Sequence, residues 1–160
     1  MTDFLVSLVM VIPAVGCGLV AGLLFAFSTS VMPALGRLPA AHGIEVMQSV
    51  NTRIQNPVFG LLFLGTTVAC LLQMVSAAVG MDQPAAFWQL IGGLLFVVGT
   101  VMGTLVFNLP LNNTLARVDP ASAEAERLWE HFLARWTTWN HVRTLAATGS
   151  ATVLTLALRA

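Results

Sequence analysis

The sequence has 160 residues, of which 57% are hydrophobic and only 9% are charged, and its formal net charge at pH 7 is zero. Soluble domains carry about 25% charged residues, and the mean hydropathy here is +0.84. These values exclude an ordinary soluble domain, and the lack of a net positive charge argues against a nucleic-acid-binding surface. They predict an integral membrane protein.

Four apolar runs make up most of the chain, at about 4–31, 57–79, 87–109 and 141–158. Each is close to the roughly 20 residues that carry an α-helix across a bilayer. A span of this length must be helical, because lipid offers no partner for backbone N–H and C=O groups. The sequence therefore predicts one all-α membrane domain over residues 1–160, a four-helix transmembrane bundle with amphipathic helices in its two long connections. We expect the first run to stay in the mature protein, since it starts with Asp3 rather than with basic residues and is too long for a signal peptide.

The arginines, which are the only basic residues besides histidine, are distributed unevenly along the chain. Arg159 follows the last run, whereas the first and third connections hold Arg37, Arg53, Arg117, Arg127, Arg135 and the border residue Arg143. Basic residues of membrane proteins concentrate on the cytoplasmic side. The two long connections are therefore predicted to face the cytoplasm, with both termini outside, in what we expect to be the inner (plasma) membrane of a bacterium.

The first connection, residues 39–56, has the pattern of an amphipathic helix. Its apolar stripe consists of Ile44, Met47, Val50 and Ile54. Asn51 lies in the same stripe, and a polar side chain on a buried face needs a partner there. Asn56 and Pro57 fit the cap and the first position of the second span.

The connection after the third run predicts a helix that opens at Asp119-Pro120. Its apolar stripe consists of Leu128, Trp129, Phe132, Leu133 and Trp136. Such a helix lies on the headgroups or covers the end of the bundle. Trp129, Trp136 and Trp139 fit an interfacial aromatic belt as well as a wall against which a ligand stacks.

Polar side chains concentrate at four helix ends that antiparallel packing brings to the cytoplasmic face. They are Ser28, Thr29, Ser30, Asn51, Asn56, Asn108, Asn112, Asn113, Asn140, His141 and Arg143. This convergence predicts a shallow polar pocket at the inner mouth of the bundle. The alternative is that these side chains cap helices and reach lipid phosphates.

Four segments resemble the small membrane proteins of the DUF1772, or anthrone oxygenase, family. They are F-S-T-S-V-M-P-A-L (27–35), M-Q-S-V-N-T-R-I-Q-N-P-V-F (47–59), N-L-P-L-N-N-T-L-A (108–116) and W-T-T-W-N-H-V-R-T (136–144). The resemblance implies a monooxygenase-type oxidoreductase that converts an anthrone to an anthraquinone with molecular oxygen. It implies no evident metal or flavin, so no cofactor is expected.

Anthrone chemistry requires a base, a partner for the enolate oxygen and an apolar slot. His141 is the candidate base, and Arg143 is the candidate partner of the oxyanion. The expected substrate-binding residues are Asn51, Asn108, Asn112, Trp136, Trp139 and Asn140. The competing roles are an ordinary interfacial histidine and an arginine bound to lipid phosphate.

Other functions stay open from the sequence alone. No ligand spacing indicates a metal site, and haem ligation by His141 has no further support. Cys17 and Cys70 are expected to be buried thiols. A non-catalytic membrane subunit, a transporter or a protein that binds a lipid or small molecule remain alternatives. Gly18-x-x-x-Gly22 and Gly99-x-x-x-Gly103 allow close helix contact, either within the bundle or in a homo-oligomer.

Overall fold

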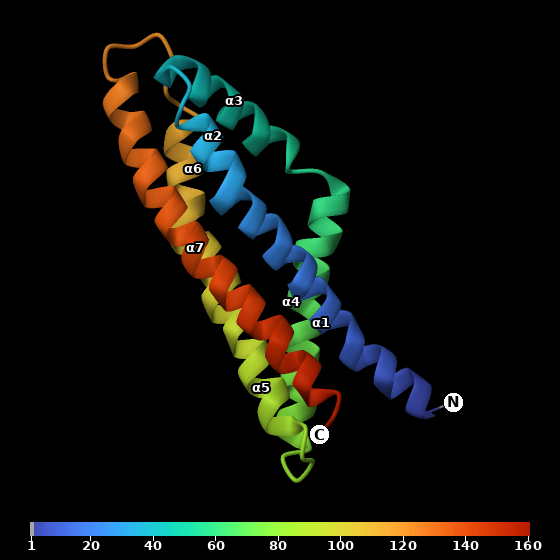
Figure 1. Ribbon diagram of the computed structural model, residues 1–160. Coiled ribbons are helices and arrows are strands. Elements are labelled where there is room, and N and C mark those ends of the chain that lie inside the picture. The colour runs from blue at the N-terminus through green and yellow to red at the C-terminus, as the bar shows by residue number, and fades with distance from the viewer. Residues whose placement is uncertain (1) are drawn as a thin grey trace.

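The computed structural model describes the backbone of residues 2–160 and the side chains of residues 10–160. Within that part every regular element is helical, and no β-strand occurs. The prediction of an all-α protein is therefore confirmed. The long helices run side by side in an elongated bundle, and α3 (Ala40–Arg53) lies at one end of it (Figure 1).

The N-terminal half contains two long helices with α3 between them. The first is α1 (Thr2–Ala26), which continues through a π-helical segment, η1 (Phe27–Val31), into α2 (Met32–Leu35). The second is α4 (Pro57–Val79), which coincides with the predicted span 57–79. The Asn56 side chain caps α4 by accepting the N–H groups of Val58 and Phe59, both at 3.0 Å, so its predicted capping role is confirmed.

A third long helix begins at α5 (Ala86–Leu94) and continues through the π-helical segments η2 (Leu95–Met102) and η3 (Thr104–Asn108) into α6 (Leu109–Leu115). It therefore extends beyond the predicted end at residue 109. Proline lacks an N–H and clashes with the carbonyl four residues earlier in an α-helix. The wider π-helical turns directly before Pro110, like those before Pro33, give the ring room and let the helix continue.

The last helix, α7 (Ala125–Ala157), has 33 residues and unites two elements that were predicted to be separate. It contains both the predicted interfacial helix and most of the predicted span 141–158. Its predicted start at Asp119-Pro120 is wrong, because the Asp119 carboxylate accepts the N–H of Ala121 at 3.0 Å and closes a turn there. No glycine or proline lies between residues 121 and 148, so nothing interrupts the helix.

Within the described part of the chain, three helices are long and apolar enough to cross a membrane, namely Met10–Leu35, Pro57–Val79 and Ala86–Leu115. They indicate a membrane protein. Helix α7 is not among them, because His141, Arg143 and several hydroxyl side chains lower its hydropathy. The buried face of α7 runs along most of its length, from Ala125 to Ala157.

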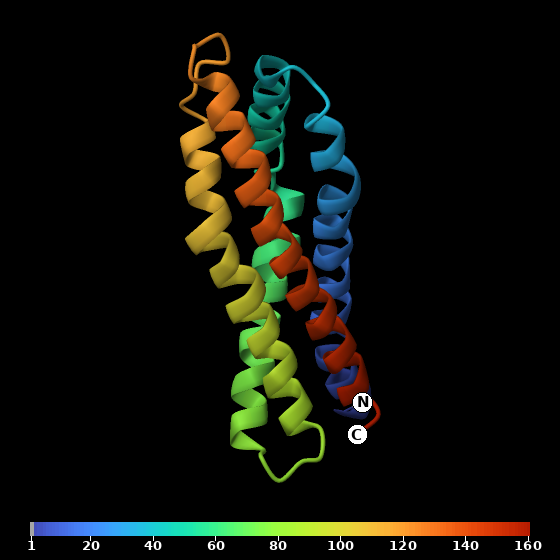
Figure 2. The ribbon, with the colours of Figure 1, turned by 60° about the vertical axis from the view of Figure 1, so that its left-hand side comes forward.

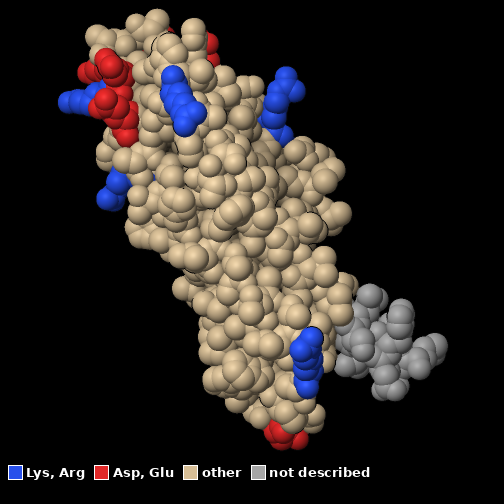
Figure 3. Space-filling view, viewed as in Figure 1, with Lys and Arg blue, Asp and Glu red and all other residues tan. Residues whose placement is uncertain are grey.

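Charged side chains lie at the two ends of the bundle, with an uncharged face between them (Figure 3). The start of α1, the end of α7 and the turn between α4 and α5 lie at one end, and α3 lies at the other (Figures 1 and 2). Helix α4 exposes a row of apolar side chains between these ends, including Val58 (78% exposed), Leu61 (77%) and Leu64 (65%). Apolar exposure of this extent fits a surface that faces lipid.

The core between the long helices is formed by small and apolar side chains, including Cys17, Cys70, Phe96, Ala147 and Leu154. Both cysteines are free and fully buried, as predicted, and their sulfur atoms lie 3.7 Å apart. The Ser150 hydroxyl donates to the carbonyl oxygen of Gly92 at 2.7 Å and ties α7 to α5.

The two glycine pairs face in different directions. A methyl group at Gly99 would overlap the Cβ of Ala146 on α7, and one at Gly103 would lie 3.2 Å from the Cγ of Arg143. Gly99-x-x-x-Gly103 therefore serves packing inside the chain. A methyl group at Gly18 or Gly22 would meet no atom within 4 Å.

A second apolar cluster lies at the end that holds α3. It contains Met32, Leu35, Ile44, Met47, Leu115, Ala125, Trp129, Phe132 and Trp136. The predicted apolar stripe of α3 packs on the N-terminal half of α7 here, and Gly43 permits the approach, since a methyl group there would lie 2.6 Å from the Trp129 ring. Trp129 and Trp136 are consequently buried in protein rather than in an aromatic belt.

Candidate functional site

A cavity of about 790 Å³ lies where α3 meets the long helices. This volume falls within the roughly 300–1,000 Å³ that is typical of small-molecule sites. Side chains from α1 and η1, α3, α4, η3, α6 and α7 line it. They include Leu23, Leu24, Phe27, Glu45, Met47, Gln48, Asn51, Ile54, Phe59, Thr104, Leu109, Asn112, Trp136 and Arg143.

Arg143 is the one arginine of the chain that is buried, with 5% of its surface exposed. Its Nη1 donates to the Thr104 hydroxyl at 2.9 Å, and its Nη2 donates to the Asn140 side-chain oxygen at 2.6 Å. Its Nε has no partner among the residues described. The groups that hold this guanidinium are therefore uncharged, although a buried charge is costly unless it is paired.

Asn140 fixes Arg143 from the far side and links α7 to α1. Its side-chain nitrogen donates to the carbonyl oxygen of Leu24 and to the hydroxyl of Ser28, both at 2.7 Å. Asn140 itself is fully buried. Both N–H groups of the amide are thus used, and its oxygen is held in position to accept from the guanidinium.

Trp136 forms the apolar wall next to Arg143. The guanidinium carbon lies 5.5 Å from the centre of the Trp136 ring, within the range of a cation–π contact. The indole N–H donates to the Asn112 side-chain oxygen at 2.7 Å, and Asn108 donates to the backbone oxygen of Trp136 at 3.1 Å. These bonds hold the ring at a fixed angle, while Phe27 packs against it with ring centres 5.9 Å apart.

Helix α3 provides the opposite wall. The side-chain nitrogen of Gln48 donates to the backbone oxygens of Leu115 at 2.8 Å and Val118 at 3.0 Å, which ties α3 to the end of α6. The side-chain nitrogen of Asn51 is buried and has no partner among the residues described. Glu45 is exposed and is the one carboxylate among the residues that line the cavity.

The structure brings four of the eight predicted site residues onto the cavity wall: Asn51, Asn112, Trp136 and Arg143. Asn108 and Asn140 lie directly behind that wall and hold Trp136 and Arg143 in place. The prediction that Asn51, Asn112, Asn140 and Arg143 share one neighbourhood agrees with this arrangement.

Trp139 and His141 lie outside the cavity. The Trp139 ring stacks on Phe107, with parallel rings 3.4 Å apart. His141 is exposed and does not line the cavity. Successive residues of an α-helix point about 100° apart, so a helix that turns Asn140 and Arg143 inward turns His141 outward. This placement is at odds with His141 as the base.

Sequence reasoning missed three polar residues of the site, namely Glu45, Gln48 and Thr104. Thr104 sits inside an apolar run, where a hydroxyl attracts little notice, and Gln48 lies beside the apolar stripe of α3. A signal for Thr104 was present, because Thr104, Asn108 and Asn112 recur at intervals of four and so share one helix face.

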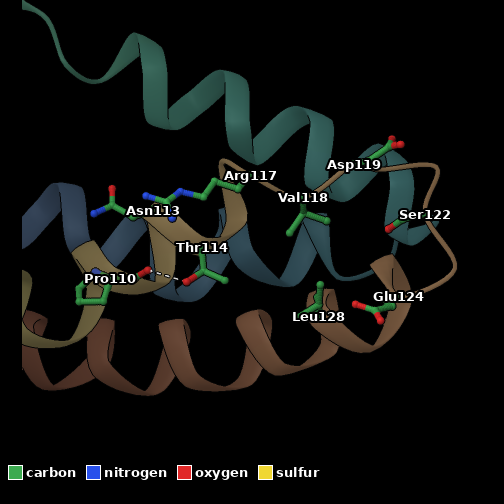
Figure 4. A pocket seen from close by; sticks show the side chains of 9 residues that line it. All are labelled: Pro110, Asn113, Thr114, Arg117, Val118, Asp119, Ser122, Glu124 and Leu128. Atoms are coloured by element: carbon green, nitrogen blue, oxygen red, sulfur yellow. Dashed lines mark hydrogen bonds between the residues drawn. The ribbon is translucent and has the colours of Figure 1, made fainter.

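A second, smaller cleft of about 530 Å³ lies between α6, the following loop and the start of α7. Figure 4 shows its lining side chains, among them Arg117, Asp119 and Glu124. These three side chains are exposed, and none of the predicted site residues lines this cleft. Among the side chains described, no three His, Cys, Asp or Glu residues are grouped so as to hold a metal ion.

Comparison with known proteins identifies the family to which the chain belongs. No curated protein and no solved structure matches the sequence. The family model described as anthrone oxygenase matches residues 49–153. This range includes α4 to α6, most of α7 and the part of α3 that carries Asn51. Because the match spans well over half of the chain, the protein belongs to the anthrone oxygenase (DUF1772) family.

Proposed function

We propose that the chain is a four-helix transmembrane bundle of the bacterial inner membrane, with its arginine-rich end in the cytoplasm and both termini outside. The fourth span is the C-terminal part of α7. The buried position of Arg143 supports this arrangement, since its charge faces the bundle interior instead of lipid. The exposed positions of Arg37, Arg53, Arg117 and Arg127 at the α3 end fit the cytoplasmic orientation.

Within this bundle, we propose that a planar aromatic or polyketide-type substrate is oxidised in the 790 Å³ cavity by anthrone-to-quinone chemistry. One observation carries the proposal: the cavity places a buried guanidinium with only uncharged partners beside an aromatic ring. Flat apolar rings fit against Trp136, and a developing oxyanion fits beside Arg143. Family membership supports the same reaction class.

The reaction balances with molecular oxygen as the only oxidant. Loss of a proton from the ring methylene of an anthrone gives an aromatic enolate, whose charge rests on the oxygen beside Arg143. The enolate carbon then adds O₂ and a proton to form a hydroperoxide. Loss of water from the hydroperoxide breaks its O–O bond and the remaining C–H bond and leaves the quinone carbonyl, so that one O₂ yields one quinone and one water.

Because His141 is exposed and does not line the cavity, we propose a different base. Glu45 lines the cavity from α3 and carries the one carboxylate there. A carboxylate at the cavity wall can accept the proton of a methylene whose acidity Arg143 raises by stabilising the enolate. We therefore assign the base to Glu45, and His141 becomes the matched control.

The test is oxidation of anthrone by the purified protein in lipid nanodiscs under O₂, with quinone formation measured above the autoxidation background. A general base contributes about 10²-fold or more, so Glu45→Gln should lower kcat by at least that factor. Arg143→Lys should also lower kcat more than it raises KM, because a point charge replaces a planar fork. His141→Phe should retain wild-type turnover.

Slow turnover by His141→Phe together with normal turnover by Glu45→Gln would restore His141 as the base. Normal turnover by both Glu45→Gln and Arg143→Lys would show that the cavity is not the active site. No quinone above background from the wild-type protein would favour the alternative functions, a membrane subunit or a protein that binds or transports a small molecule.

A further inference from the structure

The cavity wall contains a positive charge that the protein positions but does not neutralise. Both groups that accept hydrogen bonds from the Arg143 guanidinium are neutral, the Thr104 hydroxyl and the Asn140 amide oxygen. An uncompensated charge with 5% exposure is unfavourable in a low-dielectric interior. A negative charge brought by a ligand would offset that cost.

Asn140 explains how the charge is held without being cancelled. Its oxygen occupies the place that a carboxylate oxygen takes in an ordinary ion pair, 2.6 Å from Nη2. Its nitrogen must donate to Leu24 O and Ser28 Oγ, both at 2.7 Å, which an aspartate at this position could not do. The network therefore selects the neutral amide.

The same pattern continues along the wall. Asn112 accepts the indole N–H of Trp136 through its side-chain oxygen, and the side-chain nitrogen of Asn51 is buried without a partner among the residues described. Glu45 is the exception, but it is exposed, so water screens its charge far more than that of Arg143.

We propose that this cavity selects its ligand by charge. The ligand that it binds in the absence of any reaction is an organic anion with a planar aromatic body, such as an aromatic carboxylate or phenolate. This inference rests on the site assigned above but not on its reaction. Arg143 provides the anion contact. The apolar body is enclosed by Trp136, Leu23, Phe27 and Phe59.

Two fluorescent probes of nearly equal shape separate the contribution of the charge to the affinity from that of the aromatic rings. Anthracene-9-carboxylate is an anion at neutral pH, whereas anthracene-9-carboxamide has the same rings and a carbonyl acceptor but no charge. Neither has the ring methylene of an anthrone, so neither is a substrate for the proposed oxidation. Binding is measured by quenching of tryptophan fluorescence in phosphatidylcholine nanodiscs, with protein-free nanodiscs as the partition blank.

The wild-type protein should bind the carboxylate at least about tenfold more tightly than the carboxamide, the effect of one charge-assisted hydrogen bond. This comparison needs no variant and cannot be confused with misfolding. Equal affinity for the two probes, or a preference for the carboxamide, would overturn the proposal.

Substitutions then test whether Arg143 is the charge that causes the preference for the carboxylate. Arg143→Gln should abolish the preference, and Arg143→Lys should retain part of it. Asn112→Asp adds a carboxylate to the wall while it still accepts the Trp136 N–H, so it should lower the preference at least about threefold. Gln83→Glu makes the same chemical change in the exposed turn at the other end and should have no effect. An equal effect of these two variants would contradict a local role.

A lipid anion is the rival source of the same chemistry. Oleate and nanodiscs containing phosphatidylglycerol should leave the carboxylate affinity within about twofold if the site requires a planar body. Displacement of the probe by either one would show that the cavity is a lipid site and would overturn the aromatic assignment. A protein that prefers the carboxylate but forms no quinone from anthrone would refute only the proposed reaction.

Discussion

Replacing Gly99 with alanine tests whether the close approach of α7 to the third long helix supports the bundle. The added methyl group would overlap the Cβ of Ala146, which has no rotamer through which to move away. Overpacking of this kind costs about 1–3 kcal/mol. Alanine also favours a helix over glycine by roughly 1 kcal/mol, and this gain must be removed from the comparison.

Gly22→Ala provides that reference, because its methyl group would meet no atom within 4 Å. The two variants gain the same helix propensity, so the difference between their unfolding free energies is the overpacking alone, about 1–3 kcal/mol. For a chain of this size each kcal/mol moves Tm by roughly 2–4 °C. Gly99→Ala should therefore melt about 2–12 °C below Gly22→Ala when thermal unfolding is followed in nanodiscs.

The double variant Gly99→Ala, Ala146→Gly moves the methyl group from α7 to its neighbour and should restore the wild-type Tm to within about 2 °C, since the propensity changes cancel. Equal melting of Gly99→Ala and Gly22→Ala would refute the contact. A double variant less stable than Gly99→Ala would show that Ala146 stabilises the bundle in another way.

Three further measurements follow from particular side chains. Gln73 is buried with both amide atoms unpaired among the residues described, so Gln73→Met should raise the free energy of unfolding by about 1 kcal/mol; a fall would show that the amide has a bound partner. Asn56→Ala removes the cap of α4 and should lower that free energy by about 1 kcal/mol, whereas Asn56→Ser should not. Cys17 and Cys70 are fully buried, so an impermeant maleimide added to intact cells should label this protein only after Asp82→Cys. If the Asp82→Cys protein is labelled only in inverted vesicles, this turn lies in the cytoplasm.

The convergence of Asn51, Asn112 and Arg143 could be predicted because it depends on topology. In an antiparallel bundle the ends of the first and third helices lie beside the starts of the second and fourth, and the sequence carries polar residues at those ends. The amphipathic stripe of α3 was predictable for a similar reason, since it depends on spacing alone. Neither inference needs the rotation of a helix about its own axis.

The position of His141 depends on that rotation. Its neighbour Asn140 faces inward, and His141 points about 100° away from it. Which of the two faces inward is decided by how α7 seats on Gly99 and Gly103. These contacts join residues that are 40 and 47 positions apart in the sequence, and they leave no local signal. The continuity of α7 does have a local signal, because no glycine or proline occurs between residues 121 and 148.

The π-helical turns before Pro33 and Pro110 are places where the chain can lose a residue without turning the rest of the helix. A π-helical turn holds about one residue more than an α-helical turn, so removing one residue from η3 would leave an α-helical turn there. The segments on both sides would keep their orientation, and Asn112 would stay next to Trp136. The same deletion within the α-helical part of α7 would instead turn every following side chain by about 100°.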